Sequence, residues 1–193
     1  MDKNCYDLRN AIFSLHTRRF GTVSEIMIKK LLSYGPSKNQ FHDLYDKSNN
    51  LRVEVKFSRA QKKEDTITDE NIKKQLEKIT SFENRMFPSS DWKHHKFDCN
   101  IQQVKSTEFD ILFYGIFFAD VVMIFRLLPE NLNSEINFSD KQHKGNLGEG
   151  QFHLNNLTYE KHLQHYFHKK LSYCELNEVI STITTDSKIK IIK

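Results

Sequence analysis

The run FDILFYGIFFADVVMIFRLL, residues 109–128, constrains the fold of this chain more than any other segment. Charged residues interrupt it at Asp110, Asp120 and Arg126, and its longest uncharged piece, 111–119, has only nine residues. A membrane-spanning helix needs about 20 predominantly apolar residues. The run therefore predicts two buried strands, over 110–118 and 121–128, and no membrane association.

The composition fits one soluble globular domain. The chain has 193 residues, of which 38% are hydrophobic and 28% charged, so it can bury a core of its own. Helical and strand periodicities alternate along it, which predicts a mixed α/β (α+β) fold. The expected helices cover 5–16, 22–34, 66–82, 158–169 and 174–182, and the further expected strands cover 41–46, 51–58 and 99–105.

The cysteines and the charge say little about partners. Cys5, Cys99 and Cys174 are far apart and form no CxxC pair, so we expect reduced thiols in a cytoplasmic protein. The net charge of +4 is compatible with a polyanionic partner, but many unrelated proteins are as basic.

The segment NNLRVEVKFSRA, residues 49–60, combines a strand pattern with charged side chains. If KSNN, residues 47–50, is a four-residue hairpin loop, Asp43 lies opposite Glu54. Side chains alternate between the two faces of a strand. The hairpin then has an apolar face (Leu44, Leu51, Val53, Val55, Phe57) and a polar face (Asp43, Tyr45, Arg52, Glu54, Lys56).

Two facing carboxylates predict a site for a hard divalent cation. The Cβ atoms of Asp43 and Glu54 would be roughly 4.5–5.5 Å apart as cross-strand neighbours, and their charges repel unless a cation lies between them. Mg²⁺ binds carboxylate oxygens, water and phosphate oxygens. Lys56, on the same face, would hold or help deprotonate an attacking water and stabilise charge on phosphorus. This is the residue set of a metal-dependent phosphodiesterase.

Two other interpretations fit the same residues. A loop of three or five residues would put Asp46 in place of Asp43; we prefer Asp43 because its register keeps Leu44 on the apolar face. Alternatively, Glu54 and Lys56 form an ordinary solvated pair, since Glu-x-Lys on an exposed strand is common.

The order of these features resembles the PD-(D/E)xK nuclease superfamily. It comprises an amphipathic helix with an early Glu, an Asp in a first strand and D-x10-E-x-K in a hairpin. Within the superfamily, residues 20–128 are most similar to a small type II restriction endonuclease. His42 replaces the proline that gives the motif its name. The segments that carry the resemblance are GTVSEIMIKKLLSYG, HDLYDKSNNLRVEVKFS, QLEKI, IQQVKSTEFDILFYGIFFAD and VVMIF.

The resemblance implies a restriction-endonuclease-like core over 1–193, with a central mixed β-sheet flanked by helices. It implies Mg²⁺-dependent cleavage of double-stranded DNA that leaves 5′-phosphate ends, with Mn²⁺ as a substitute metal. Asp43 and Glu54 would be the metal carboxylates, the Val55 carbonyl a further ligand and Lys56 the catalytic lysine. A two-fold homodimer is the simplest way for one site per chain to cut both strands.

Two further residues have competing interpretations. Glu25 matches the helix glutamate that binds the metal, directly or through water, in many such nucleases. It also fits a capping box, in which Thr22 opens the helix and Glu25 bonds back to the Thr22 N–H. Gln75 resembles a polar residue that some relatives turn toward the site, but it fits an exposed helix position equally well.

Basic and amide side chains supply the candidate DNA contacts. Phosphate contacts give affinity and base-edge contacts give sequence information, while the competing interpretation is a solvated polar surface. We expect the polar, glycine-containing segment KQHKGNLGEGQFHLNN, residues 141–156, to enter a DNA groove, with 129–193 forming this recognition loop and a C-terminal helical part. The phosphate candidates are Arg18, Arg19, Arg59, Lys62, Lys63 and Lys105; the base-reading candidates are Gln102, Gln103, Gln142, His143, Lys144, Asn146, Gln151, His153 and Asn155.

Two other functions compete with a restriction endonuclease. A repair nuclease, junction resolvase or RNA-cleaving toxin of the same fold would cut without a fixed sequence. A DNA-binding protein without chemistry would bind DNA and leave it intact.

Overall fold

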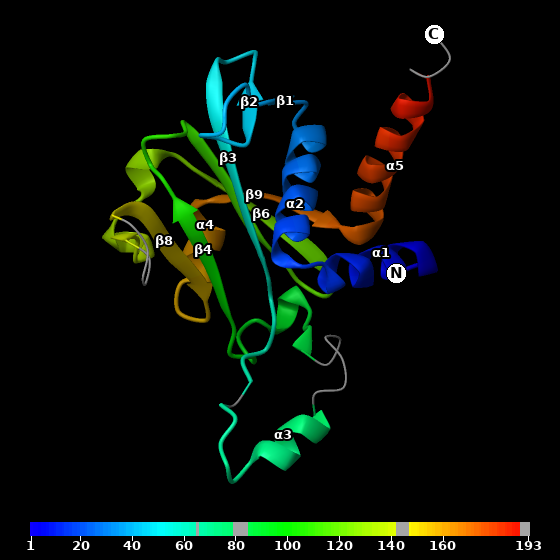
Figure 1. The fold of residues 1–193 in the computed structure, drawn as a ribbon, viewed down its shortest axis with the longest axis vertical. Coiled ribbons are helices and arrows are strands. Elements are labelled where there is room, and N and C mark those ends of the chain that lie inside the picture. The colour runs from blue at the N-terminus through cyan, green and yellow to red at the C-terminus, as the bar shows by residue number, and fades with distance from the viewer. Residues whose placement is uncertain (65, 79–84, 142–146, 190–193) are drawn as a thin grey trace.

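The computed structural model describes residues 1–64, 66–78, 85–141 and 147–189, without the side chains of Lys78 and 183–189. Figure 1 shows the arrangement of the helices and strands. In chain order they are α1 (Lys3–Ser14), α2 (Thr17–Leu31), β1 (Gly35–Pro36), β2 (Leu44–Asp46), β3 (Leu51–Arg59), α3 (Ile72–Lys78), β4 (Asp98–Val104), β5 (Ile111–Phe117), β6 (Val121–Leu127), β7 (Ser139–Lys141), β8 (Leu147–Asn155), α4 (Tyr159–His165), β9 (Phe167–Ser172) and α5 (Tyr173–Ile189), with single 3-10 turns at Ser89–Asp91, Pro129–Asn131 and Ser134–Ile136.

The strands form two sheets. The larger has the order β1-β2-β3-β5-β6-β9, in which β3 and β5 are parallel and the other neighbours antiparallel. The smaller is antiparallel, with the order β4-β8-β7. In Figure 1, α1, α2 and α5 lie on one side of the large sheet, and β4, β8 and α4 lie on the other. The predicted mixed α/β fold with a central mixed sheet flanked by helices is confirmed.

Strand β5 is buried on both faces, as its uncharged sequence predicts. Phe113 and Phe117 pack with the helices α1, α2 and α5 in one hydrophobic core. Leu112, Tyr114 and Ile116 point the other way, into a second core with β4, β8 and α4. Because side chains alternate along a strand, the single apolar segment β5 contributes side chains to both cores. Strand β3 pairs with β5, so it also lies between the helices and the small sheet.

The hairpin has the predicted register. Leu44 pairs with Val53 and Asp46 with Leu51, so the loop has four residues. The Asp46 carboxylate accepts hydrogen bonds from the backbone of Ser48 and Asn49, as Asp does at turns. Since Asp46 is committed to the loop, its substitution for Asp43 in the candidate site is excluded.

Helix α2 begins at Thr17, five residues earlier than expected. Thr22 therefore lies inside the helix, where its hydroxyl donates to the Arg18 carbonyl at 3.2 Å. A capping box requires Thr22 at the helix start, so that interpretation of Glu25 is wrong. The early start arises because Phe20 is buried in the first turn, while Ile26, expected inside, is 40% exposed.

Three expectations for other segments are also wrong. The segment expected to be a polar loop contains β7 and β8, and the helix expected over 158–169 ends at His165, followed by strand β9. Ile72 and Leu76, expected as a buried stripe, are 47% and 60% exposed. Figure 1 shows the reason, since α3 stands apart from both sheets.

A disulfide joins Cys5 of α1 to Cys174 of α5, so the prediction of reduced thiols is wrong for these two residues. The packing of α1 against α5 brings them together, which the sequence separation of 169 could not reveal. Cys99 is a buried free thiol. Within the described part of the chain, every helix is too short or too polar to cross a membrane.

Candidate active site

The Asp43 carboxylate is fixed against strand β3. The Asp43 backbone N–H donates to the Val53 carbonyl at 3.2 Å, and the Val55 N–H donates to Asp43 Oδ2 at 2.9 Å. These bonds continue the hairpin ladder by one residue beyond β2. Asp43 is thereby held opposite Glu54, as the hairpin register predicts.

Lys56 bridges the two carboxylates. Its Nζ contacts Glu54 Oε1 and lies 3.9 Å from Asp43 Oδ2. A single cation can therefore interact with both acidic side chains at once. The predicted juxtaposition of Asp43, Glu54 and Lys56 is confirmed, and their chemical role stays a prediction.

Glu54 is an acidic side chain in a buried position, with only 8% of the residue exposed. Burial raises its pKa to about 7, with a further increase from Asp43 and an opposing decrease from Lys56. Glu54 Oε2 is buried and has no hydrogen-bond partner among the described residues. A buried, unpaired carboxylate oxygen is costly, and ligation of a cation would remove that cost.

Lys56 remains a cation in this setting. Burial acts to lower its pKa, but the charges of Glu54, Asp43 and Glu25 outweigh burial and raise the pKa above its ordinary value. An amine whose pKa is raised holds its proton near neutral pH. Lys56 is therefore suited to orienting water and neutralising negative charge, rather than to removing a proton.

Helix α2 brings Glu25 to the same site. Its pKa is raised by burial and by the Asp43 charge, and is lowered by Lys56. These effects place the Glu25 carboxylate within electrostatic reach of both side chains. With the capping box excluded, the structure supports the interpretation of Glu25 as a site residue.

The backbone of Val55 also faces the site. Groups of alternate residues point to the same edge of a strand. Since Val53 O and Val55 N both interact with Asp43, the Val55 carbonyl emerges on that edge, beyond the end of β2. It therefore points away from β5, toward the Asp43 side of β3.

The residues present fit a magnesium or manganese ion, which prefers oxygen ligands. Glu54 offers an unpaired buried oxygen, Asp43 a second carboxylate and Val55 a carbonyl. In the part of the chain that the structure describes, the carboxylates of Asp43, Glu54 and Glu25 do not all approach within 4.8 Å of one another. Glu25 therefore fits the role of a ligand through water better than that of a direct ligand.

A cavity of about 220 Å³ opens beside these residues, and the small sheet supplies its second wall. Gln103 lies at a bulge of β4 with a φ of 58°, and Lys105 follows it. Both had been predicted as DNA contacts, and the structure brings both to the candidate site. The complete lining is Gln40, Phe41, Asp43, Glu54, Lys56, Gln103, Lys105, Glu108 and Glu149.

Sequence reasoning missed four of these lining residues. Gln40 and Phe41 directly precede the His42-Asp43 pair and could have been found from that proximity. Glu108 and Glu149 lie 3.5 Å and 3.9 Å from the Lys105 ammonium. Glu108 is three residues from Lys105, a spacing that is visible in the sequence, whereas Glu149 reaches Lys105 only because β8 pairs with β4, which no local pattern indicates.

His42, which replaces the motif proline, is a packed residue. It is 7% exposed and lies beside Tyr45, with 6.1 Å between ring centroids. Its Nδ1 has no hydrogen-bond partner among the described residues. His42 therefore has a packing role in the segment that carries Asp43.

The candidate phosphate contacts have different environments. Arg18 and Arg19 are exposed in the first turn of α2. Arg59 donates to the carbonyls of Phe13 and Leu15 and stacks on Phe20, which gives it a structural role at the end of α1. Two of the remaining candidates, Lys62 and Lys63, line a separate cavity beyond the end of β3.

The remaining polar candidates fall into three groups. Gln151, His153 and Asn155 lie on strand β8 rather than in a loop. Gln75 is buried on α3 and is not among the residues that line the cavity. Four further candidates lie outside the described residues: Gln142, His143, Lys144 and Asn146.

Comparison of this chain with protein-family models, with curated proteins and with solved structures found no match.

Proposed function

We propose that this chain is a Mg²⁺-dependent nuclease of the PD-(D/E)xK type that cleaves double-stranded DNA at specific sequences, as type II restriction endonucleases do. The observation that carries the proposal is the convergence of Asp43, Glu54 and Lys56 on one cavity. Glu54 adds a buried oxygen that no described residue satisfies. A solvated surface pair would expose both its charges instead.

The ion would be held by Asp43, Glu54 and the Val55 carbonyl, with Glu25 reaching it through water. When bound, Mg²⁺ or Mn²⁺ polarises the phosphoryl oxygen and lowers the pKa of water. The peptide N–H of Val55 keeps the Asp43 carboxylate oriented for that task.

The protein groups divide the remaining work. The Lys56 ammonium orients the attacking water and stabilises the negative charge that develops on the phosphoryl oxygens. The raised pKa of Glu25 makes its carboxylate a stronger base than an ordinary glutamate, so it accepts the water proton. A new P–O bond forms as the bond to the 3′-oxygen breaks, and solvent protonates that oxygen. The products carry a 5′-phosphate and a 3′-hydroxyl.

A homodimer follows from the same proposal. The described part of the chain carries one such site, and a two-fold homodimer is the simplest way to cut both strands of a palindrome. Cleavage of both strands at symmetric positions would agree with this assembly.

The decisive experiment is incubation of the full chain with phage DNA in Mg²⁺ or in EDTA, followed by sequencing of the fragment ends. We expect discrete fragments in Mg²⁺ that share one end motif. Lys56→Ala should abolish cutting, while the matched control Lys47→Ala, in the exposed hairpin loop, should cut like the wild type. DNA left intact by the wild type with both Mg²⁺ and Mn²⁺ would refute the proposal. Cuts without a shared motif would instead indicate a repair nuclease or resolvase.

A further inference from the structure

The small sheet has one apolar and one polar face. Cys99, Ile101, Phe152 and Leu154 are buried in the second core. The alternate residues point away from that core, and the β4–β8 register pairs them across the two strands. We call them the β4–β8 polar face: Asp98, Asn100 and Gln102 of β4, and Gln151, His153 and Asn155 of β8.

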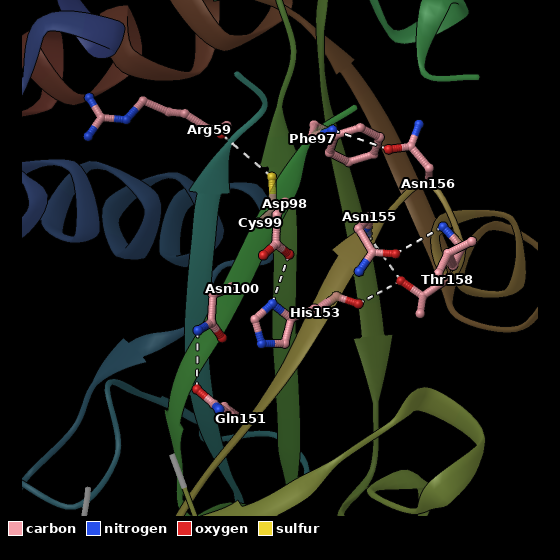
Figure 2. A network of polar contacts seen from close by, with 11 residues as sticks. Arg59, Phe97, Asp98, Cys99, Asn100, Gln151, His153, Asn155, Asn156 and Thr158 are labelled. Atoms are coloured by element: carbon pink, nitrogen blue, oxygen red, sulfur yellow. Dashed lines mark hydrogen bonds and ion pairs between the residues drawn. The ribbon is translucent and has the colours of Figure 1, made fainter. Parts of the chain in front are cut away.

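Hydrogen bonds orient the side chains of this face (Figure 2). Asn100 Nδ2 donates to Gln151 Oε1 at 3.1 Å, and His153 Nδ1 lies 2.8 Å from Asp98 Oδ1. Because a carboxylate only accepts, His153 Nδ1 is the donor in this contact. The side chains of Asp98 and His153 are 45% and 35% exposed. The face is thus both ordered and accessible.

The Gln151 amide keeps the capacity for two further bonds. Its Nε2 takes no part in the bond from Asn100, and Oε1 has a second lone pair. Glutamine held in this way presents a donor beside an acceptor. That is the complement of the N7 acceptor and N6 donor of adenine in the major groove.

The β4–β8 polar face connects two other features. At one end, the bulge at Gln103 turns β4 into the candidate active site, where Glu149 of β8 also lines the cavity. At the other end, Lys63 and Lys96 line a second cavity, of about 330 Å³, together with Asp98 and Asn155. The β4–β8 polar face therefore extends from the candidate active site to Lys63 and Lys96.

We propose that the β4–β8 polar face reads base edges in the major groove of the duplex that the candidate site cleaves, with Gln151 contacting an adenine. This inference rests on the proposed nuclease function. The major groove admits a two-stranded β-ribbon. The β4–β8 pair presents this face as part of a three-stranded sheet, in which β7 pairs only with the 147–151 part of β8, and Lys63 and Lys96 contact the flanking phosphates. Asn100 and Asp98 are positioning residues, because they act through Gln151 and His153.

The test is selection of bound duplexes from a library with a randomised core, with Ca²⁺ in place of Mg²⁺, alongside cleavage of the same library in Mg²⁺. We expect the wild type to select one motif. Gln151→Ala should lose discrimination at one adenine by about tenfold to a hundredfold, and Asn100→Ala should weaken the same position. Lys63→Ala should lower affinity for all sequences equally. The matched control Gln164→Ala, an exposed amide on α4, should keep the wild-type motif.

The outcomes separate this inference from the nuclease proposal. A selected motif that Gln151→Ala leaves unchanged, or wild-type binding without sequence preference, overturns the inference even if DNA is cut. A motif that loses its adenine in Gln151→Ala, in a protein that never cuts, supports the inference and refutes the nuclease. Circular dichroism melting of each variant identifies any loss of the fold, and in that case Gln151→Glu, which keeps the shape but removes the donor, decides the question.

Discussion

The backbone N–H of Val55 donates to the Asp43 carboxylate at 2.9 Å. This bond joins two residues twelve positions apart, on either side of the hairpin, and it fixes the candidate metal carboxylate against the strand that carries Glu54 and Lys56. The bond also separates the structural role of Asp43 from its chemical role, because an amide oxygen can accept the same hydrogen.

Asp43→Asn should therefore remove activity while preserving the fold. We expect its free energy of unfolding to stay within about 1 kcal/mol of the wild type, whereas Asp43→Ala should lose about 1–3 kcal/mol because the Val55 N–H loses its acceptor. Cleavage by Asp43→Asn should fall about a hundredfold or more, since the metal loses a charged ligand. Urea unfolding and a plasmid-cleavage assay measure the two effects. An active Asp43→Asn enzyme would rule out Asp43 as a ligand, and Asp69→Asn, an exposed carboxylate on another segment, is the control.

The raised pKa of Glu54 predicts how stability depends on pH without metal. In the folded protein the Glu54 carboxyl has a pKa of about 7, against an ordinary value of 4.5, so it keeps its proton over a wider pH range than in the unfolded chain. The contribution of Glu54 is therefore fully present below pH 4.5 and is lost as the pH rises through 7. It amounts to roughly 3 kcal/mol, since one pKa unit corresponds to about 1.4 kcal/mol. Urea unfolding in EDTA between pH 5 and 8 should show this fall in the free energy of unfolding. In Glu54→Gln the part of the fall that comes from Glu54 should be absent. Equal pH dependence in the two proteins would contradict the assignment.

Metal binding should displace the same proton. A ligating carboxylate must be ionised, so the apparent Mg²⁺ affinity should rise about tenfold per pH unit below 7 and level off above it. Calorimetric titrations in buffers of different ionisation enthalpy count the protons released, and we expect close to one per ion at pH 6. A proton count of zero at that pH would show that the ion binds elsewhere. Glu54→Gln should bind the ion weakly and without this pH dependence.

The sequence was sufficient to predict the hairpin because its signals are local. Asp46 and Asn50 suit a four-residue loop: Asp46 bonds to the loop backbone, and Asn50 adopts a φ of 58°, which Asn tolerates better than most residues. The alternation of side chains along the two hairpin strands then predicts that Asp43, Glu54 and Lys56 lie on the same face. The two buried strands that follow were predictable for the same reason.

The remaining errors have tertiary causes. Phe152 and Leu154 alternate with polar residues as a strand requires, but nearby glycines and amides suggested a loop until pairing with β4 determined the structure. The disulfide depends on the packing of α1 against α5, and Glu149 reaches the cavity only through β8. None of these contacts leaves a pattern within a single segment.

The position of Thr22 inside α2 allows a direct test of Glu25. If Glu25 were a capping residue, Thr22→Ala would remove the cap and cost about 0.5–2 kcal/mol. Because Thr22 only donates to the Arg18 carbonyl within the helix, we expect Thr22→Ala to change the unfolding free energy by less than about 0.5 kcal/mol and to leave cleavage unchanged. Glu25→Gln should also unfold like the wild type, yet cut about a hundredfold more slowly, because the attacking water loses its proton acceptor. Only the part of the loss that comes from weaker metal binding should recover at high Mg²⁺, since Glu25 also acts as a ligand through water. Thermal melts and cleavage rates over a Mg²⁺ series distinguish the two roles: stability lost in Thr22→Ala, with full activity in Glu25→Gln, would return Glu25 to a purely structural role.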